Sequence, residues 1–163
     1  MFSSELSLRQ WLEHSLSLHQ IPFIKNEPSL NSTFGIPDYH ITYNSYTIWL
    51  ELKHAKPASP KSSPGIFHSP IRPNQKKHLK LLQNPPTSHA GILLSTPTHH
   101  QPFAIRIRKN TLTSTFDLNP SSPLSLINHS PNIINPLAIS SDKILALLDF
   151  IIADTHIILL PIT

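Results

Sequence analysis

The sequence predicts an α/β fold in which helices flank one mixed β-sheet within a single domain. Segments with the spacing of an amphipathic helix alternate along the chain with short runs rich in Ile, Tyr, Thr and Phe, which are typical of strands. The chain has 163 residues and no cysteine. It is therefore long enough for one ordinary core, and it has neither disulfides nor thiolate zinc sites.

The elements are expected in a fixed order, with gaps where the composition favours loops. They are a helix at 3–19, a strand at 21–25, a hairpin at 36–43 and 46–54, a helix at 73–83, strands at 90–95 and 103–107, a helix at 142–152 and a strand at 156–160. The first helix has one apolar face, formed by Leu8, Trp11, Leu12 and Leu16. Pro73 suits the first turn of the second helix, and Ser141 suits the N-cap of the last.

Three segments lack such a pattern. Residues 26–34 and 55–71 are expected to be loops, the second of them exposed because it is rich in Pro, Ser and Lys. Residues 111–140 are rich in Pro, Asn and Ser and show no period. We therefore expect a core at 1–110 and a C-terminal extension at 111–163 that packs on it and holds the last helix and strand.

The predicted hairpin brings two acids together. If Asn44 and Ser45 form its two-residue turn, the numbers of paired residues sum to 89 and Asp38 lies opposite Glu51. Directly opposed residues of one sheet face have Cβ atoms about 5 Å apart, where like charges repel. A shared cation removes that repulsion, and paired carboxylates with phosphate and water suit Mg²⁺. A surface hairpin with unrelated charges is the alternative interpretation.

Strand alternation adds an amine to this pair. Lys53 projects to the same face as Glu51, whereas Leu50 and Leu52 project to the other. A lysine beside a bound metal would position the attacking water or stabilise charge on a phosphorane-like transition state. The sequence therefore predicts hydrolysis of a phosphodiester at this face, with Mg²⁺ as the cofactor and Mn²⁺ as a substitute.

These residues resemble a known signature. The segments 35–38 (Gly-Ile-Pro-Asp) and 49–53 (Trp-Leu-Glu-Leu-Lys), with a Gln-bearing helix after 72–75 (Arg-Pro-Asn-Gln), resemble the PD-(D/E)XK nuclease superfamily, in particular its VRR-NUC and Holliday junction resolvase-like members. The resemblance covers residues 3–107. It implies that Asp38 and Glu51 bind the metal, that Lys53 is the catalytic lysine, and that Gln75 supports the site.

The resemblance also implies an acid from the first helix, for which Glu5 and Glu13 are the candidates. Glu5 lies at the edge of the apolar face, whereas Glu13 points away from its centre, so helical geometry favours Glu5. Gln75 shares a helical face with Leu79 and Leu82, and a polar group on a core-facing stripe needs a partner. Exposure to solvent in the first helical turn is the alternative for Gln75.

The formal net charge is +4 and the sequence pI is about 9.5, which favours a polyanionic partner. Cations near the predicted site would form a rim for DNA phosphates. The nearest to the second helix are Arg72, Lys76, Lys77 and Lys80, and Lys56, Lys61, Arg106, Arg108 and Lys109 would extend the rim. A solvated basic face is the alternative for each of them.

The sequence gives less support to a zinc site, to nucleotide binding or to a membrane protein. The 11 histidines show no helical zinc spacing, and neither a P-loop nor a dinucleotide motif is present, so no nucleotide cofactor is expected. His40 shares the face of Asp38 and is a candidate neighbour of the site, whereas His54 is expected to be structural. The apolar stretch 144–161 is interrupted by charges, and no charged and apolar leader opens the chain. We therefore expect no membrane span and a cytoplasmic protein.

The sequence thus predicts a metal-dependent endonuclease that cuts DNA. Branched or junction DNA is the substrate implied by the resemblance, and a two-fold homodimer would suit paired cuts. The absence of valine, with 3 glycines and 9 acids, indicates a G-poor coding strand like that of a phage or mobile element. The alternatives are a site-specific homing or restriction endonuclease, a non-catalytic nucleic-acid-binding module of the same fold, and a structural protein with an accidental motif.

Overall fold

A computed structural model describes residues 4–26, 35–57, 66–68, 71–82, 86–95, 103–107, 115–117, 133–134 and 144–153. The elements within these ranges are α1 (Glu5–Leu18), β1 (Phe23–Lys25), β2 (Tyr39–Tyr43), β3 (Tyr46–His54), β4 (Lys56–Pro57), β5 (Ile66–His68), α2 (Pro73–Leu81), β6 (Ser88–Ser95), β7 (Phe103–Arg106), β8 (Thr115–Asp117), β9 (Ile133–Ile134) and α4 (Ile144–Ile152).

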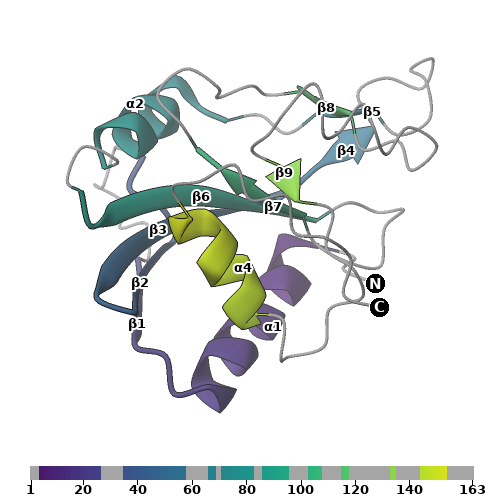
Figure 1. Cartoon of the computed structure of the whole chain (residues 1–163). Helices are drawn as coiled ribbons and strands as arrows, with labels where there is room; N and C mark the ends of the chain where they lie inside the picture. The colour runs from purple at the N-terminus through teal and green to yellow at the C-terminus, as the bar shows by residue number, and fades with distance from the viewer. Residues whose placement is uncertain are drawn as a thin grey trace.

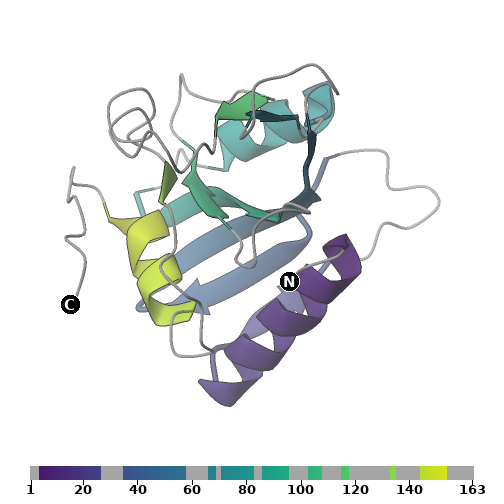
Figure 2. The ribbon, with the colours of Figure 1, turned by 90° about the vertical axis from the view of Figure 1, so that its right-hand side faces the viewer.

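Six strands form the main sheet, in the order β1-β2-β3-β6-β7-β9. The central pair β3–β6 is parallel, and every other pair in this sheet is antiparallel. The parallel pair needs a crossover, and α2 supplies it. Helices α1 and α4 cover one face of the sheet and α2 covers the other (Figures 1 and 2). The predicted fold, a mixed sheet flanked by helices, is confirmed.

The β2–β3 hairpin has the predicted turn and register. Asn44 and Ser45 have φ of 49° and 65°, which is the left-handed conformation that a two-residue hairpin turn of the primed type requires. Tyr39 pairs with Leu50 and Tyr43 with Tyr46, so the paired numbers sum to 89 as predicted. No bulge interrupts this ladder, so the side-chain alternation of β3 extends unbroken from the turn to its far end.

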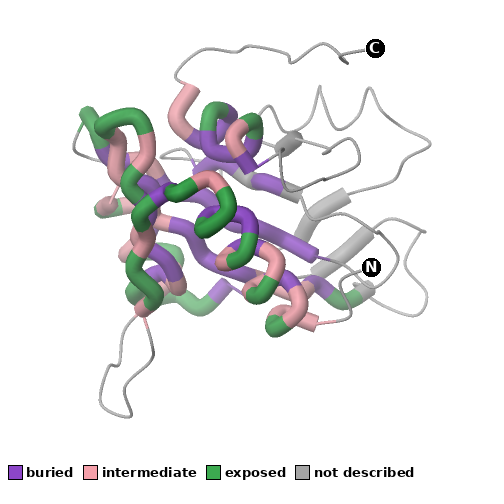
Figure 3. The backbone as a smooth tube through the Cα atoms, turned by 90° about the horizontal axis from the view of Figure 1, so that it is seen from below, coloured by how far each residue is buried: buried purple, intermediate pink, exposed green. Residues whose placement is uncertain are grey.

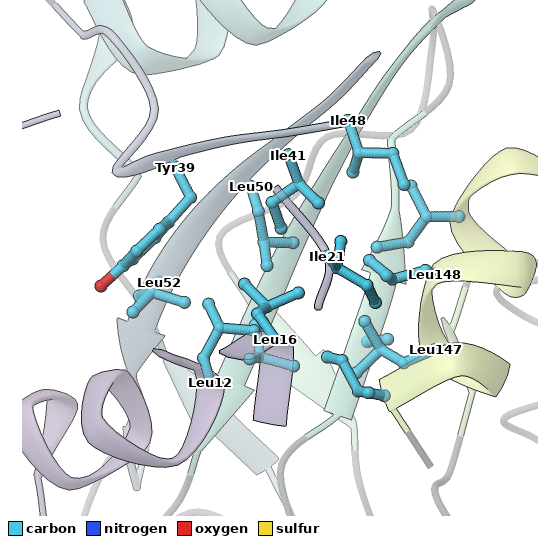
Figure 4. Packing of buried hydrophobic residues seen from close by; sticks show 14 of the residues in the cluster. Leu12, Leu16, Ile21, Tyr39, Ile41, Ile48, Leu50, Leu52, Leu147 and Leu148 are labelled. Carbon is cyan, nitrogen blue, oxygen red and sulfur yellow. The ribbon is translucent and has the colours of Figure 1, made fainter. Parts of the chain in front are cut away.

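Two apolar cores lie on opposite faces of the sheet. The larger packs the apolar faces of α1 and α4 against alternate residues of β2 and β3, and Figure 4 shows its leucines and isoleucines meeting between the helices and the sheet. Figure 3 shows buried residues along the strands, with buried and exposed positions alternating along the helices. The smaller core lies under α2 and contains Leu79, Ala90, Ile92 and Leu94, with Trp49 packed against it. Because α2 lies over β6, it brings its first turn close to the α2-facing side of β3.

Several sequence predictions need correction, and others, including the loop expected at 26–34 beyond Asn26, fall outside the described residues. The expected loop at 55–71 contains β4 and β5, and the unpatterned stretch 111–140 contains β8 and β9. Strands β4, β5 and β8 form a second, three-stranded sheet. Such short strands hold too few residues to show an alternating pattern. Ser141 and the strand expected at 156–160 lie outside the described residues.

The expected C-terminal extension contributes to the core through α4, whose buried residues include Leu147, Leu148 and Ile151. The boundary at residue 110 stays a prediction. In the part of the chain that the structure describes, the helices are too short or too polar to cross a bilayer.

Candidate active site: a buried glutamate beside an aspartate

Glu51 is the most buried acid in the described residues, with 1% of its side chain exposed. Its neighbours Leu50 and Leu52 project into the α1/α4 core. Strand alternation therefore turns Glu51 to the α2 side of the sheet, together with Lys53. A carboxylate taken out of water costs free energy unless charges and hydrogen bonds compensate it.

One oxygen of Glu51 is compensated by two donors. Lys53 Nζ lies 2.5 Å from Glu51 Oε1, and Gln75 Nε2 donates to the same oxygen. The side chain of Gln75 is held at its other end as well, because its Oε1 accepts a hydrogen bond of 3.0 Å from the backbone N–H of Arg72. The first turn of α2 thus holds an amide donor against Glu51. Gln75 contacts the acid and not only solvent, as its place on the core-facing stripe predicted.

The second oxygen of Glu51 differs. Oε2 is buried, and it accepts no hydrogen bond from the described residues. An ionised oxygen in such a place is unfavourable unless a cation meets it.

Asp38 lies at the end of the hairpin, next to Glu51. It precedes β2, and its Oδ2 accepts a hydrogen bond of 2.7 Å from the backbone N–H of Leu52. Asn26 fixes this stretch from β1, because its backbone N–H donates to the carbonyl of Asp38 at 2.8 Å and its side chain donates to the carbonyl of Pro37 at 2.8 Å. One oxygen of Asp38 is therefore anchored to β3, as one oxygen of Glu51 is anchored by Lys53 and Gln75.

The two carboxylates influence each other electrostatically. The pKa of Glu51 is raised from its ordinary value of 4.5 to about 7, first by burial and then by the charge of Asp38, against the lowering effect of Lys53. The charge of Glu5 contributes a smaller increase to the same pKa. Near neutral pH the site therefore holds a carboxyl poised between its neutral and ionised forms, as expected where two acids share a low-dielectric space.

The two candidate acids of α1 have different surroundings. Arg9 Nη2 lies 3.9 Å from Glu5 Oε1 and 3.9 Å from Asp38 Oδ1, so Glu5 belongs to the charge cluster around Asp38. Glu13 accepts a hydrogen bond from the hydroxyl of Tyr39 and lies 3.7 Å from Lys25. Burial and the bond to Glu13 raise the pKa of Tyr39. The role of Glu5 in the site stays a prediction.

Two residues of the cluster were not foreseen from the sequence. Arg9 has a usable signal, because it follows Glu5 by four residues and acid–base pairs at that spacing meet on a helix. Asn26 has none, because it opens a segment with loop composition and its contacts depend on the pairing of β1 with β2.

The predicted basic rim is only partly assembled. Arg72, Lys76 and Lys77 are exposed on α2 and Lys80 is half-exposed, and Lys56 is exposed on β4. Lys61, Arg108 and Lys109 lie outside the described residues.

Arg106 does not extend the rim, contrary to the prediction. Its guanidinium is buried on the α4 side of the sheet, donates hydrogen bonds to the carbonyls of Phe150 and Ala153, and lies over the ring of Phe150. A guanidinium there satisfies carbonyls at the C-terminal end of α4, where the helix dipole favours positive charge.

The two histidines near the site have structural contacts. His40 stacks on Trp49 with ring centroids 4.6 Å apart and planes inclined by 12°. The ring Nδ1 of His54 lies 2.9 Å from the hydroxyl of Ser95 on the neighbouring strand. The structural role expected for His54 agrees with this contact.

The acids present fit a divalent metal. Asp38 and Glu51 each keep one oxygen anchored, and the buried Oε2 of Glu51 lacks a hydrogen-bond donor among the described residues. Within those same ranges no three His, Asp or Glu side chains gather into a ready-made metal site. A pair of carboxylates completed by phosphate and water is an arrangement that suits Mg²⁺, which keeps several waters in its coordination shell.

The comparisons with known proteins find similarity to solved structures only. No protein-family model matches the sequence, and no curated protein matches it. A solved structure of Hjc, a Holliday junction resolvase from Archaeoglobus fulgidus, aligns with a TM-score of 0.45 and 14% identity, covering 70% of this chain and 86% of that chain.

Proposed function

We propose that the protein is a metal-dependent nuclease that hydrolyses phosphodiester bonds in DNA. One observation carries the proposal. A buried glutamate near a second carboxylate has one oxygen held by a lysine and a glutamine, while its other oxygen accepts no hydrogen bond from the residues that the structure describes. A purely structural site would satisfy that oxygen, because an unpaired buried carboxylate destabilises the fold. The resemblance of 35–38 and 49–53 to the PD-(D/E)XK signature supports the same proposal.

Each residue of the cluster has a definite task. Asp38 and Glu51 would hold Mg²⁺, or Mn²⁺ in its place, and the ion would supply positive charge for the scissile phosphate and a more acidic water. Lys53 presents an ammonium group beside Glu51, where it stabilises the negative charge that develops on the phosphate during attack. Gln75 keeps Glu51 Oε1 in place, so that the carboxylate does not rotate away from the site.

The exposed cations at α2 would bind the phosphates of the substrate and so position it at the acids. Arg72, Lys76 and Lys77 lie on the helix whose first turn contacts Glu51, so a nucleic-acid backbone that reaches the acids also passes these side chains. Such contacts go to phosphates and are independent of base sequence. We propose branched or junction DNA as the preferred substrate, cut in pairs by a two-fold dimer inside the cell. Base-specific cutting and binding without cleavage are the competing outcomes of the test.

The test is cleavage of end-labelled duplex, single-stranded, flap and four-way junction DNA, with matching RNA, in Mg²⁺, Mn²⁺ and EDTA. We expect cutting with either metal and none in EDTA. The variants Asp38→Asn, Glu51→Gln and Lys53→Met should each lose on the order of 100-fold or more in rate, with DNA binding retained. The matched control is Asp149→Asn, which alters an exposed acid bonded to Tyr43 on the other face of the sheet. Its rate should equal that of the wild type.

Intact DNA under all of these conditions would contradict the proposal. If binding persisted without any effect of metal, the protein would be a binding module of this fold.

A further inference from the structure

Gly35 lies in unusually close contact with the helix that carries Gln75. A Cβ placed on Gly35 would lie 2.6 Å from the carbonyl carbon of Asn74, 2.7 Å from its oxygen and 2.6 Å from the backbone nitrogen of Gln75. These three atoms belong to one peptide bond in the first turn of α2. Because they are backbone atoms, no side-chain rotation would relieve the overlap.

The backbone of Gly35 also has a conformation that other residues rarely adopt. Its φ is +76°, in the left-handed region where a side chain is strained and glycine is not. Conformation and close approach therefore both exclude a side chain at this position.

The contact joins the two halves of the candidate site. Gly35 is three residues before Asp38, whose carboxylate is anchored to β3. The peptide on the other side of the contact ends at Gln75, whose amide donates to Glu51. The spacing between the Asp38 segment and α2 is thus set by two backbones in direct contact.

We propose that Gly35 is a positioning residue, which lets α2 approach closely enough for Gln75 to hold Glu51 in the orientation that the metal and Lys53 require. The inference deepens the nuclease function proposed above and rests on it. Real Cβ contacts are essentially never shorter than 3.0 Å and ordinary contact begins at 3.4 Å, so a methyl group at Gly35 pushes the Asn74–Gln75 peptide away by about 0.4 to 0.8 Å. A shift of that size displaces the amide of Gln75 from Glu51 and alters the length and direction of their hydrogen bond. Misplacing a group near the reacting atoms by about 1 Å costs up to about 100-fold in rate.

The kinetic test uses Gly35→Ala, Gln75→Ala and the double variant. If Gly35 acts through Gln75, each single variant lowers kcat about 10- to 100-fold with KM nearly unchanged, and the double variant is no slower than the slower single variant. Multiplying effects in the double variant would overturn the proposal. The matched control is Asn44→Ala, which places alanine at φ 49° in the turn at the far end of the hairpin. It should lower the melting temperature through backbone strain alone and leave kcat unchanged.

A second readout needs no cleavage activity. In NMR spectra of the full chain, Gly35→Ala should shift the side-chain amide resonances of Gln75 and speed their exchange with water, whereas Asn44→Ala should leave both as in the wild type. Unchanged resonances in Gly35→Ala would refute the inference. If Gly35→Ala does not fold, the same measurement uses Ile36→Gly, which makes the neighbouring backbone more flexible without adding an atom. It should speed the exchange of the Gln75 amide, and wild-type exchange would again refute the inference.

A protein that cuts no DNA but shows the expected NMR changes would contradict the proposed function while leaving the role of Gly35 in place.

Discussion

Replacing Glu51 by glutamine should stabilise the metal-free protein at alkaline pH. The carboxyl is 1% exposed and its pKa rises from 4.5 to about 7, mainly because of burial and then because of Asp38. Each pKa unit corresponds to about 1.4 kcal/mol, so ionising Glu51 costs the folded state about 3 kcal/mol. Glutamine has nearly the same shape and never ionises, which removes this cost. The ionised carboxylate thus lowers the stability of the metal-free protein but provides a negative charge that can bind a cation.

The sign of the pH dependence follows from linkage. Because the folded state holds this proton more tightly than the unfolded state, the free energy of unfolding of the wild type falls between pH 4.5 and about 7 and is level above that range. Below pH 4.5 the carboxyl is neutral in both states, and Glu51→Gln should match the wild type. By pH 8 the variant should be more stable by about 3 kcal/mol.

The assay is urea denaturation of both proteins in EDTA at a series of pH values from 4.5 to 8. Tryptophan fluorescence reports the unfolding. Titrating groups far from Glu51 cancel in the difference between the two proteins, so the difference reports Glu51 and the charges coupled to it. Added Mg²⁺ should stabilise the wild type at pH 8 and have little effect on the variant. The argument that Glu51 is a buried acid whose charge is compensated by a cation would be refuted by either of two results. The free energies of unfolding of the two proteins could change in parallel with pH, or the wild type could be the more stable protein at pH 8.

Three further predictions test separate parts of the account. Arg106→Met should lower the free energy of unfolding by about 2 kcal/mol in urea denaturation, because it leaves carbonyls at the end of α4 unpaired, and should leave the cleavage rate per folded molecule unchanged. Glu5→Gln should slow single-turnover cleavage more than Glu13→Gln, because Glu5 acts on the pKa of Glu51 whereas Glu13 is bonded to Tyr39. Equal rates would contradict this. Replacing Lys76 and Lys77 by alanine should weaken DNA binding and reduce the slope of log affinity against log salt by about 2. An unchanged slope would show that neither lysine contacts the DNA phosphates.

The hairpin shows how far local rules reach. The two turn residues set the register as far as the pair Tyr39–Leu50, Asp38 directly precedes that pair, and alternation places Lys53 on the same face as Glu51. All of these follow from residues close together in the chain, whose geometry is set by the turn and the pleat.

The remaining features depend on packing between distant segments. Nothing local to β7 indicates that Arg106 faces the end of α4, 44 residues further along the chain. The contact of Gly35 with α2 likewise requires the crossover that returns the chain from β3 to β6. A sequence pattern identifies faces of an element, whereas the partner of each face is decided by the tertiary fold.

The central claim is that Asp38 and Glu51 share one divalent cation. The most direct measurement is an anomalous difference map from crystals of the protein grown with Mn²⁺. The account predicts a peak within coordination distance of Glu51 Oε2 and of Asp38, and no such peak in crystals of Glu51→Gln. A map with no peak between these carboxylates in the wild type, at Mn²⁺ concentrations that support cleavage, would contradict it.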